Sequence, residues 1–335
     1  MTTTNRATQK GAALILVVWT FAVLAVLAGE FAKAMREEAA ATINFKRETN
    51  DHYLAIAAIN EAIFALQARR SQGERKFRGK NVEEEATPID SLLRADGQWI
   101  DSSFNGRSYH IRVVDEGGKL SINDIQEQML AYVLDNIGFD QETAATVADS
   151  ILDWRDEDDL HRVHGAEQQY YETLPRPYRA KNGDFDAIEE LLLVRGVSEK
   201  MFYGDGDMPG LREIFSVFND SRRVNLRSMS PEVMRVLTGM DRLDADELYR
   251  RRAEEGHDIS EELRGLLAPS GVPTRTGTPL VLTIEARVRD EGGRITTQVA
   301  VVVRIPPRGD GFRTYRWYDS VFGLQRPEQP EDDLV

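Results

Sequence analysis

The sequence predicts an α+β protein. A long N-terminal helix, first transmembrane and then amphipathic, is expected to pack on a small antiparallel sheet that an all-α insert interrupts. An uncharged apolar run near the N-terminus continues into a charged segment without a helix breaker. Two later regions alternate apolar and polar residues, as half-buried strands do, and the region between them has apolar residues at helical spacing. Such segregation of strands and helices is typical of α+β layers.

Residues 12–29 carry no charge and predict a membrane-spanning helix. A helix of about 20 apolar residues crosses the hydrocarbon core of a bilayer. The polar leader before it, residues 1–11, contains Arg6 and Lys10 but no acid, which favours a cytoplasmic N-terminus. The alternative interpretation is an ordinary signal anchor, or a signal peptide cleaved after Ala28.

The helix is expected to continue beyond the apolar run. Residues 30–72 contain neither Gly nor Pro, and Ile56, Ile59, Ile63 and Leu66 recur at helical spacing, which implies one buried face. A helix over residues 12–68 would be roughly 85 Å long at about 1.5 Å per residue. The polar residues 72–88 then predict a loop.

Strands are predicted on both sides of the insert. Within residues 99–122, Tyr109, Ile111 and Val113 alternate with polar neighbours, and the tetrapeptide DEGG at 115–118 predicts a hairpin turn. The same tetrapeptide at 290–293 separates two alternating runs, 282–288 and 295–303, which predict a hairpin. A last strand is expected at 312–318, followed by a Pro-rich, acidic tail.

Helical periodicity between the strands predicts four helices, at residues 126–137, 143–154, 186–194 and 231–237. Gly138 supplies a stop for the first, and Ser230 and Pro231 supply an N-cap and a first position for the last. The predicted parts are a leader (1–11), a transmembrane helix (12–29), an amphipathic helix with the first strands (30–123), an all-α insert (124–222), the remaining strands (223–320) and an acidic tail (321–335).

Composition excludes several classes of function. The net charge is −14, which argues against nucleic-acid binding, since a phosphate-binding face needs clustered Lys and Arg. The insert has two segments like helix-hairpin-helix DNA-binding modules, at 193–197 and 236–240, but the acidity favours shared packing over shared function. Cys is absent, so disulfides and thiolate chemistry are excluded. The sequence contains no nucleotide-binding loop, nucleophile elbow or dinucleotide fingerprint.

Two sets of residues carry a family resemblance. A basic leader ending in Gly11, followed by an apolar helix that becomes amphipathic, resembles the type IV pilins and the pseudopilins of type II secretion. Segments around the insert resemble the minor pseudopilin K of that system: KLSIN at 119–123, RVNLRS at 223–228, DWRDED at 153–158, GAE at 165–167, YY at 170–171, PY at 177–178, KN at 181–182 and EEL at 189–191. The resemblance extends from Gly11 to about Tyr318 and implies a pilin fold.

The resemblance implies processing and location. A prepilin peptidase is expected to cut after Gly11 and to make Ala12 the mature N-terminus, although many pilins have Phe or Met where Ala12 stands. The chain is expected in the inner membrane as a single-pass protein, with its bulk in the periplasm. Partners are expected to be the I-type and J-type minor pseudopilins, the prepilin peptidase and the membrane, but no nucleic acid.

Leu16 indicates a position in the fibre. Most pilins carry Glu there, which is thought to pair with the N-terminal amine of a neighbouring subunit, whereas K subunits carry an apolar residue. An unpaired carboxylate in lipid is costly, so a subunit with no neighbour above it can lack the acid. We therefore expect a non-enzymatic cap at the tip of a pseudopilus that exports proteins across the outer membrane. The alternative is a membrane-anchored periplasmic enzyme or sensor that depends on a metal.

The strongest candidate site is the acidic segment 153–172. Asp156, Asp158 and Glu167 have the spacing of the first, third and twelfth positions of an EF-hand, but Leu160 and His161 stand where that loop needs an oxygen ligand and Gly. The segment is therefore not an EF-hand. The family's insert is known for binding calcium, and the resemblance implies these three carboxylates as ligands of a calcium cofactor.

Three alternatives remain open for the acidic residues. The segment could be a solvated loop, with Asp153 bonded locally and Trp154 in the core. His161, His164 and Glu167 could instead form a zinc set. A second acidic pair, Asp205 and Asp207 around a Gly, is expected to be a turn.

Overall fold

The computed structural model describes residues 6–76, 95–219, 221–254, 258–290, 292–306 and 311–319. It divides into two compact units, Met1–Tyr53 and Leu54–Val335. Helix α1, Arg6–Lys76, contributes to both. Within the described residues it is the one helix long and apolar enough to cross a membrane by length and composition. Side chains of the apolar run, such as Leu14 and Trp19, are exposed.

Helix α1 is longer than predicted. It begins within the predicted leader and continues past Ala68 to Lys76, so the predicted loop at residues 72–76 is wrong. The extension is explained by the absence of Pro and by a single Gly, Gly73, which costs a helix interior only about 1 kcal/mol. The remainder of that predicted loop, residues 77–88, lies outside the described residues.

The second unit contains a five-stranded sheet in the order β1-β2-β7-β8-β9. The strands are β1 Ile100–Phe104, β2 Arg107–Asp115, β7 Val281–Arg289, β8 Ile295–Arg304 and β9 Arg313–Tyr318, and every pairing is antiparallel. This confirms the predicted sheet, including the hairpin of β7 and β8 and the last strand.

One sheet face packs on the C-terminal part of α1. The predicted stripe of α1, Ile59, Ile63 and Leu66 among its members, forms one core with alternate strand residues such as Ile111 and Ile284. Period two in the strands and a 3.6-residue period in the helix place these apolar side chains on facing surfaces. The predicted amphipathic stripe is therefore confirmed, except that Ile56 is only partly buried.

The first DEGG segment is not a hairpin turn. Residues Glu116–Gly118 form a buried 3-10 turn, η1, and β2 pairs with β1 and β7, not with the strand that follows. The actual hairpin between β1 and β2 turns at Asn105 and Gly106, both with positive φ. The cause is tertiary: Asp115 and Glu116 are buried at a junction where other elements donate hydrogen bonds to them.

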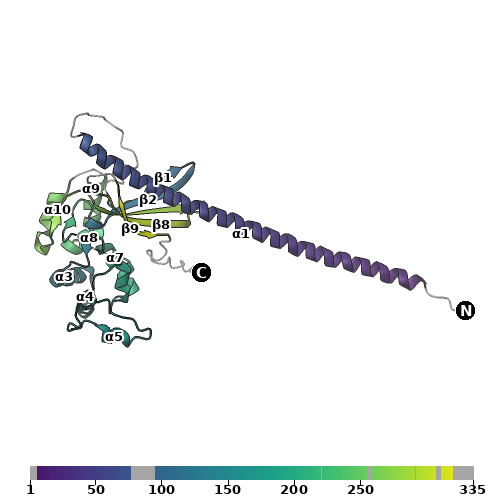
Figure 1. Cartoon of the computed structure of the whole chain (residues 1–335), viewed down its shortest axis with the longest axis horizontal. Helices are drawn as coiled ribbons and strands as arrows, with labels where there is room; N and C mark the ends of the chain where they lie inside the picture. Colours follow the sequence, from purple (N-terminus) through teal and green to yellow (C-terminus); the bar gives the residue numbers. More distant parts are fainter. Residues whose placement is uncertain are drawn as a thin grey trace. The chain divides into compact units, whose positions relative to one another are not determined.

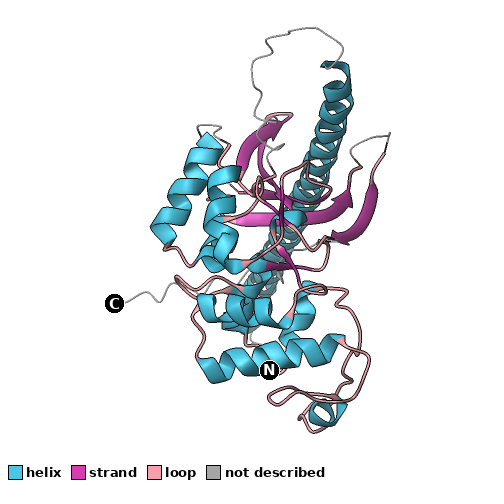
Figure 2. Ribbon diagram, turned by 90° about the vertical axis from the view of Figure 1, so that its left-hand side faces the viewer, coloured by secondary structure: helices cyan, strands magenta, loops and turns pink. Residues whose placement is uncertain are grey.

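The insert consists mainly of helices: α3 Glu127–Ile137, α4 Gln141–Arg155, α5 Gln168–Glu172, α6 Glu199–Tyr203, α7 Leu211–Ile214, α8 Pro231–Thr238, α9 Arg242–Glu254 and α10 Ser260–Leu267. Figure 1 and Figure 2 show α3, α4 and α5 grouped away from the sheet. The predicted caps are confirmed: Gly138 ends α3 with φ 101°, and the Val233 N–H donates to Ser230 Oγ at 3.3 Å.

Three details of the insert differ from the prediction. The segment expected as a helix at 186–194 is a 3-10 helix, η2 Ile188–Leu193, and the helices α5, α6, α7, α9 and α10 were not predicted. Most of α9 is charged, so it lacks the apolar stripe on which the prediction depended. Two short parallel pairs also occur: β3 Leu120–Ser121 with β4 Phe215–Ser216, and β5 Val224–Asn225 with β6 Thr274–Arg275.

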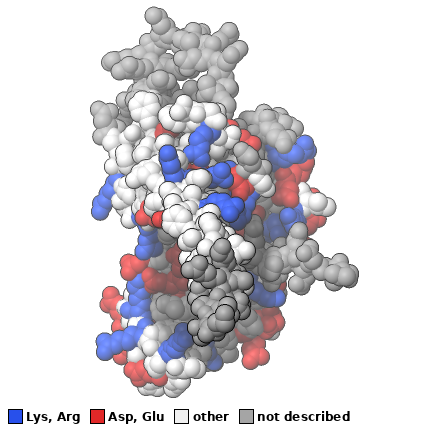
Figure 3. All heavy atoms as spheres, turned by 90° about the vertical axis from the view of Figure 1, so that its right-hand side faces the viewer, with Lys and Arg blue, Asp and Glu red and all other residues white. Residues whose placement is uncertain are grey.

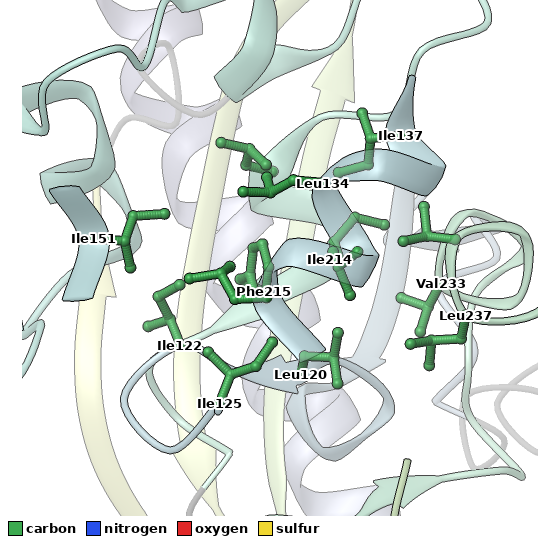
Figure 4. Packing of buried hydrophobic residues seen from close by; sticks show 14 of the residues in the cluster. Leu120, Ile122, Ile125, Leu134, Ile137, Ile151, Ile214, Phe215, Val233 and Leu237 are labelled. Carbon is green, nitrogen blue, oxygen red and sulfur yellow. The ribbon is translucent and has the colours of Figure 1, made fainter. Parts of the chain in front are cut away.

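The insert has its own apolar core, part of which is shown in Figure 4. It extends from Leu120 to Val272 and includes Phe215 of β4 and Val233 of α8. The helical core therefore does not end at residue 222, the predicted boundary, because α8, α9 and α10 contribute buried residues to it. The short 3-10 turn η3, Ala268–Ser270, follows α10. On the face shown in Figure 3, basic and acidic side chains lie among one another.

Candidate metal centre

The structure brings the three predicted ligands together. One carboxylate oxygen from each of Asp156, Asp158 and Glu167 lies within 4.8 Å of the others. Among the described residues, these three side chains form the cluster of acidic, His or Cys groups whose spacing could hold a metal ion. Glu167 is buried, Asp156 is partly buried and Asp158 is exposed, so the cluster lies at the border between the core and solvent.

Both ends of the loop that carries these residues are fixed. Trp154, near the end of α4, is buried with its ring centroid 5.2 Å from that of Tyr171. The next residue, Arg155, donates hydrogen bonds to the carbonyl oxygens of Ile122 and Ile125. Because α4 ends at Arg155, Asp156 is the C-cap of that helix, and Glu167 is the N-cap residue of α5.

The middle of the loop folds over Asp153. This carboxylate is fully buried and accepts a hydrogen bond from the Arg162 N–H at 3.1 Å. Gly165 lies so close to Asp153 that a Cβ at this position would overlap the carboxylate, so only Gly fits there. The Gly165 carbonyl accepts from Arg195 Nη1 at 2.8 Å. The alternative in which Asp153 bonds locally and Trp154 is a core residue therefore describes the base of the loop correctly.

Glu167 is a buried carboxylate without a donor. It is 5% exposed, and neither of its oxygens has a hydrogen-bond partner; the same holds for Asp156 Oδ1. Burial, with the nearby charges of Asp153, Asp156, Asp159 and Asp158, raises the pKa of Glu167 from 4.5 to about 7. Burial and the charge of Asp158 likewise raise the pKa of Asp156. The fold therefore holds negative charges together at a free-energy cost.

One arginine partly neutralises the cluster. Arg162 Nε lies 3.4 Å from Asp153 Oδ1, and Arg162 Nη2 lies 3.9 Å from Asp156 Oδ2. Its Nη1 also lies 3.6 Å from Glu127, so this guanidinium is shared among several acids. The remaining charge and the unpartnered oxygens fit a cation, and an oxygen-only donor set is what Ca²⁺ and other hard cations prefer.

Asn182 was not predicted as a site residue. Its Nδ2 donates to the Asp158 carbonyl and to Asp159 Oδ1, both at 3.1 Å, and its Oδ1 is buried without a partner. It therefore ties a separate segment to the acidic loop and offers a further oxygen. The φ of Asn182 is 45°, a left-handed conformation that Asn tolerates better than most residues. The spacing of residues in the sequence does not reveal this backbone conformation.

The alternative zinc set is not assembled. His161 is exposed and its Nδ1 lies 3.0 Å from the Arg162 carbonyl, whereas His164 Nδ1 lies 3.2 Å from Asp149. No His joins the metal-capable group found among the described residues. Leu160 is 79% exposed, in agreement with the departure from an EF-hand.

The second acidic pair forms the expected turn. The backbones of Asp205 and Met208 exchange two hydrogen bonds, of 3.0 and 3.1 Å, around Gly206. Asp205 is paired with Lys200 at 3.0 Å, and Asp207 with Arg242 at 2.8 Å. These carboxylates therefore have cationic partners in the protein, unlike those of the loop.

The residues expected to direct processing lie near the start of α1. Gly11, Ala12 and Leu16 all belong to this helix, and Leu16 is 67% exposed. The predicted cleavage between Gly11 and Ala12 and the predicted role of Leu16 stay predictions.

Comparisons with known proteins find similarity to the family that the sequence motifs resemble. The family model described as "Type II secretion system (T2SS), protein K" matches residues 109–203. The type II secretion system protein K of Pectobacterium carotovorum subsp. carotovorum is 27% identical over 203 residues, 59% of this chain and 61% of that protein. The protein K of Aeromonas hydrophila is 24% identical over 292 residues, 83% of this chain and 86% of that protein.

A solved structure shares the fold. A chain from the crystal structure of the GspK-GspI-GspJ complex of the enterotoxigenic Escherichia coli type 2 secretion system matches with a TM-score of 0.54 at 12% identity. The match covers 82% of this chain and 98% of that chain. The sequence matches therefore show similarity to type II secretion protein K, and the structural match confirms the α+β fold.

Proposed function

We propose that this chain, a relative of type II secretion protein K, is a minor pseudopilin that caps the tip of a periplasmic pseudopilus. The observation that carries the proposal is the combination of the N-terminal apolar helix with the protein K fold over most of the chain. This combination fits a structural subunit held in the inner membrane with its bulk in the periplasm. Its role would be to support protein export across the outer membrane.

Processing gives the first test of this proposal. The peptidase would cut between Gly11 and Ala12 at the membrane surface, where a side chain in place of Gly11 would obstruct it. Gly11→Val is expected to retain the leader and to abolish secretion, as measured by mass spectrometry of the N-terminus and by a secretion assay. A mature N-terminus after Ala28 would contradict the proposal.

The tip position is supported by Leu16 and by the helical insert. A subunit with an apolar residue at position 16 does not need a neighbour above it, and the helical insert would obstruct one. Leu16→Glu introduces a carboxylate into the lipid, which costs about 2.5–3.5 kcal/mol of insertion free energy. The change is expected to impair assembly. If the Leu16→Glu subunit instead spread along the fibre, the tip position would be wrong.

Calcium is the proposed ligand of the loop. The support is the pair of unpartnered Glu167 oxygens beside Asp156 and Asp158, together with the absence of sulfur or imidazole donors from the cluster. Bound Ca²⁺ would supply positive charge that ties the loop to α4 and α5. Asn182 is a further residue that would hold the ion through its Oδ1.

The complex with the I-type and J-type minor pseudopilins is the most direct test. The full chain in detergent, co-expressed with both partners, is expected to retain them in calcium and to lose part of them in chelator. Asp158→Asn/Glu167→Gln is expected to behave in calcium as the wild type does in chelator. The matched control Asp205→Asn/Asp207→Asn changes two carboxylates that already have cationic partners, and should retain the complex.

The same variants test the competing role of a metal-dependent enzyme or sensor. Loss of secretion without any measurable turnover supports the structural subunit. Secretion that persists in Asp158→Asn/Glu167→Gln, while a hydrolytic activity of the wild type disappears, would contradict it.

A further inference from the structure

A group of arginines lies on the face of the sheet opposite α1. Side chains alternate along the strands, and Ile111, Val113 and Ala286 belong to the α1-facing core. Arg112 of β2 and Arg287 of β7 therefore point to the other face. Both guanidiniums lie over the ring of Trp99, with their Cζ atoms 4.7 and 3.8 Å from its centroid. The ring fixes both cations in one place.

One buried carboxylate, that of Glu285, is hydrogen-bonded to this group, and it is already occupied. Glu285 lies opposite Arg112 in the β2–β7 register and accepts from Arg112 Nη2 at 2.9 and 3.0 Å. Gln298 of β8 donates to the same carboxylate at 3.2 Å. Glu285 is 7% exposed and Gln298 is 5% exposed, so this acceptor is built into the fold. It has little remaining capacity for a second guanidinium.

A third arginine approaches from the insert. Arg212 of α7 lies over the ring of Tyr203, with Cζ 5.1 Å from its centroid. It is in electrostatic range of its neighbour Glu213, of Glu285 and of Arg112. In the described part of the chain, neither Arg212 nor Arg287 donates a hydrogen bond to an acceptor. Three nitrogens are buried without one: Arg112 Nε, Arg212 Nη1 and Arg287 Nε. Burial lowers the pKa of Arg212 and of Arg287.

We propose that Arg112, Arg212 and Arg287 form a binding site for an oxyanion, a carboxylate or a phosphate group. Of these three guanidiniums, only that of Arg112 is hydrogen-bonded to a carboxylate, Glu285. The charges of Glu213 and Asp101 act on Arg212 and Arg287, but each of the three side chains still keeps a buried nitrogen without an acceptor. Planar guanidiniums stacked on aromatic rings keep their N–H edges available, and these edges match the oxygens of a carboxylate or phosphate. The site is separate from the acidic loop and does not depend on the proposed secretion role.

Thermal unfolding of the full chain in detergent, in calcium-free buffer, tests the site. Sodium phosphate and sodium succinate, compared with sodium chloride at equal ionic strength, are expected to raise the unfolding midpoint of the wild type. A response to succinate alone identifies a carboxylate ligand, as a protein side chain could present, and a response to phosphate alone identifies a phosphate ligand. No difference from chloride would overturn the proposal.

Variants locate the effect. Arg287→Gln and Arg212→Gln are expected to weaken binding about tenfold each, because each loses a charged hydrogen-bond donor. Arg294→Gln is the matched control: its side chain is 84% exposed, and it belongs to the turn before β8. Equal loss in the control would show non-specific screening and would overturn the site. If an arginine variant does not fold, the indole NMR signal of Trp99 in the wild type is followed instead, during addition of phosphate or succinate. If neither anion shifts this signal, the proposed site is wrong.

Discussion

Asp115 and Glu167 are both buried carboxylates, but the protein surrounds them differently. Asp115, at the junction between the sheet and the insert, accepts hydrogen bonds from the Gly117 N–H, Asn225 Nδ2 and Ser228 Oγ at 3.0, 2.8 and 2.6 Å. Glu167, in the acidic loop, is almost equally buried and accepts none. Its neighbours are other carboxylates and one shared arginine.

The difference distinguishes a structural carboxylate from a candidate ligand. A buried acid with several donors is stabilised by the fold and ties distant elements together. A buried acid with none costs free energy, unless a group from outside the chain compensates it. By this criterion Asp115 holds the sheet to the insert, whereas Glu167, with Asp156 and Asp158 beside it, is the candidate cation ligand that we propose.

Removal of the structural carboxylate is expected to have the largest effect. Asp115→Ala leaves the donors of Gly117, Asn225 and Ser228 buried without an acceptor. Each such group costs about 1–3 kcal/mol, so the free energy of unfolding should fall by about 3 kcal/mol or more. Thermal unfolding of the full chain measures this, and calcium should not restore the loss. A fall below about 1 kcal/mol would mean that Asp115 is not the tie between the layers.

Calcium should stabilise the wild type through the loop. Binding to the folded state adds about 2.7 kcal/mol when the free calcium concentration is a hundred times the dissociation constant. Asp158→Asn/Glu167→Gln is expected to erase this increase, and Asp205→Asn/Asp207→Asn should keep it. A wild-type unfolding midpoint that is identical in millimolar calcium and in chelator would exclude these residues as ligands.

Glu167 should also make the stability of the fold depend on pH. Glu167 has a pKa of about 7 in the folded chain and 4.5 as its ordinary value. Between these pH values the folded state binds more protons than the unfolded state, so stability in chelator should fall as pH rises through this window. Because Glu167→Gln cannot titrate, the difference between wild type and variant isolates the contribution. Calcium should remove the fall in wild-type stability with rising pH that Glu167→Gln lacks, since calcium favours the ionised carboxylate.

The smallest effect is expected at the second DEGG segment. Asp290 occupies the same place in that tetrapeptide as Asp115 does in the first, but it lies in a surface turn. Its Oδ1 accepts from the Arg294 N–H at 2.9 Å, and its Oδ2 lies 3.6 Å from Arg294 Nε. Asp290→Ala should reduce the free energy of unfolding by about 1 kcal/mol or less. A loss equal to that of Asp115→Ala would mean that local sequence, and not burial, sets the cost.

The sequence alone determined the features that depend on neighbouring residues. The 3.6-residue period in residues 56–66, the alternation in β7 and β8, and the caps at Gly138 and Ser230 are local, because each depends on groups a few positions apart. These features were predicted correctly. The candidate ligands Asp156, Asp158 and Glu167 were selected through family motifs, and the structure brings them together.

Only the tertiary structure decided which buried polar groups find partners. Two identical DEGG segments became a buried 3-10 turn and a surface hairpin, because only the first lies where Asn225 and Ser228 donate to its aspartate. Asn182 is likewise brought to the acidic loop from a distant segment, and Arg212 of the insert is brought into electrostatic range of Arg112 and Glu285 in the sheet. The physical reason is that hydrogen bonds and charges act through space over a few ångströms, whatever the sequence separation.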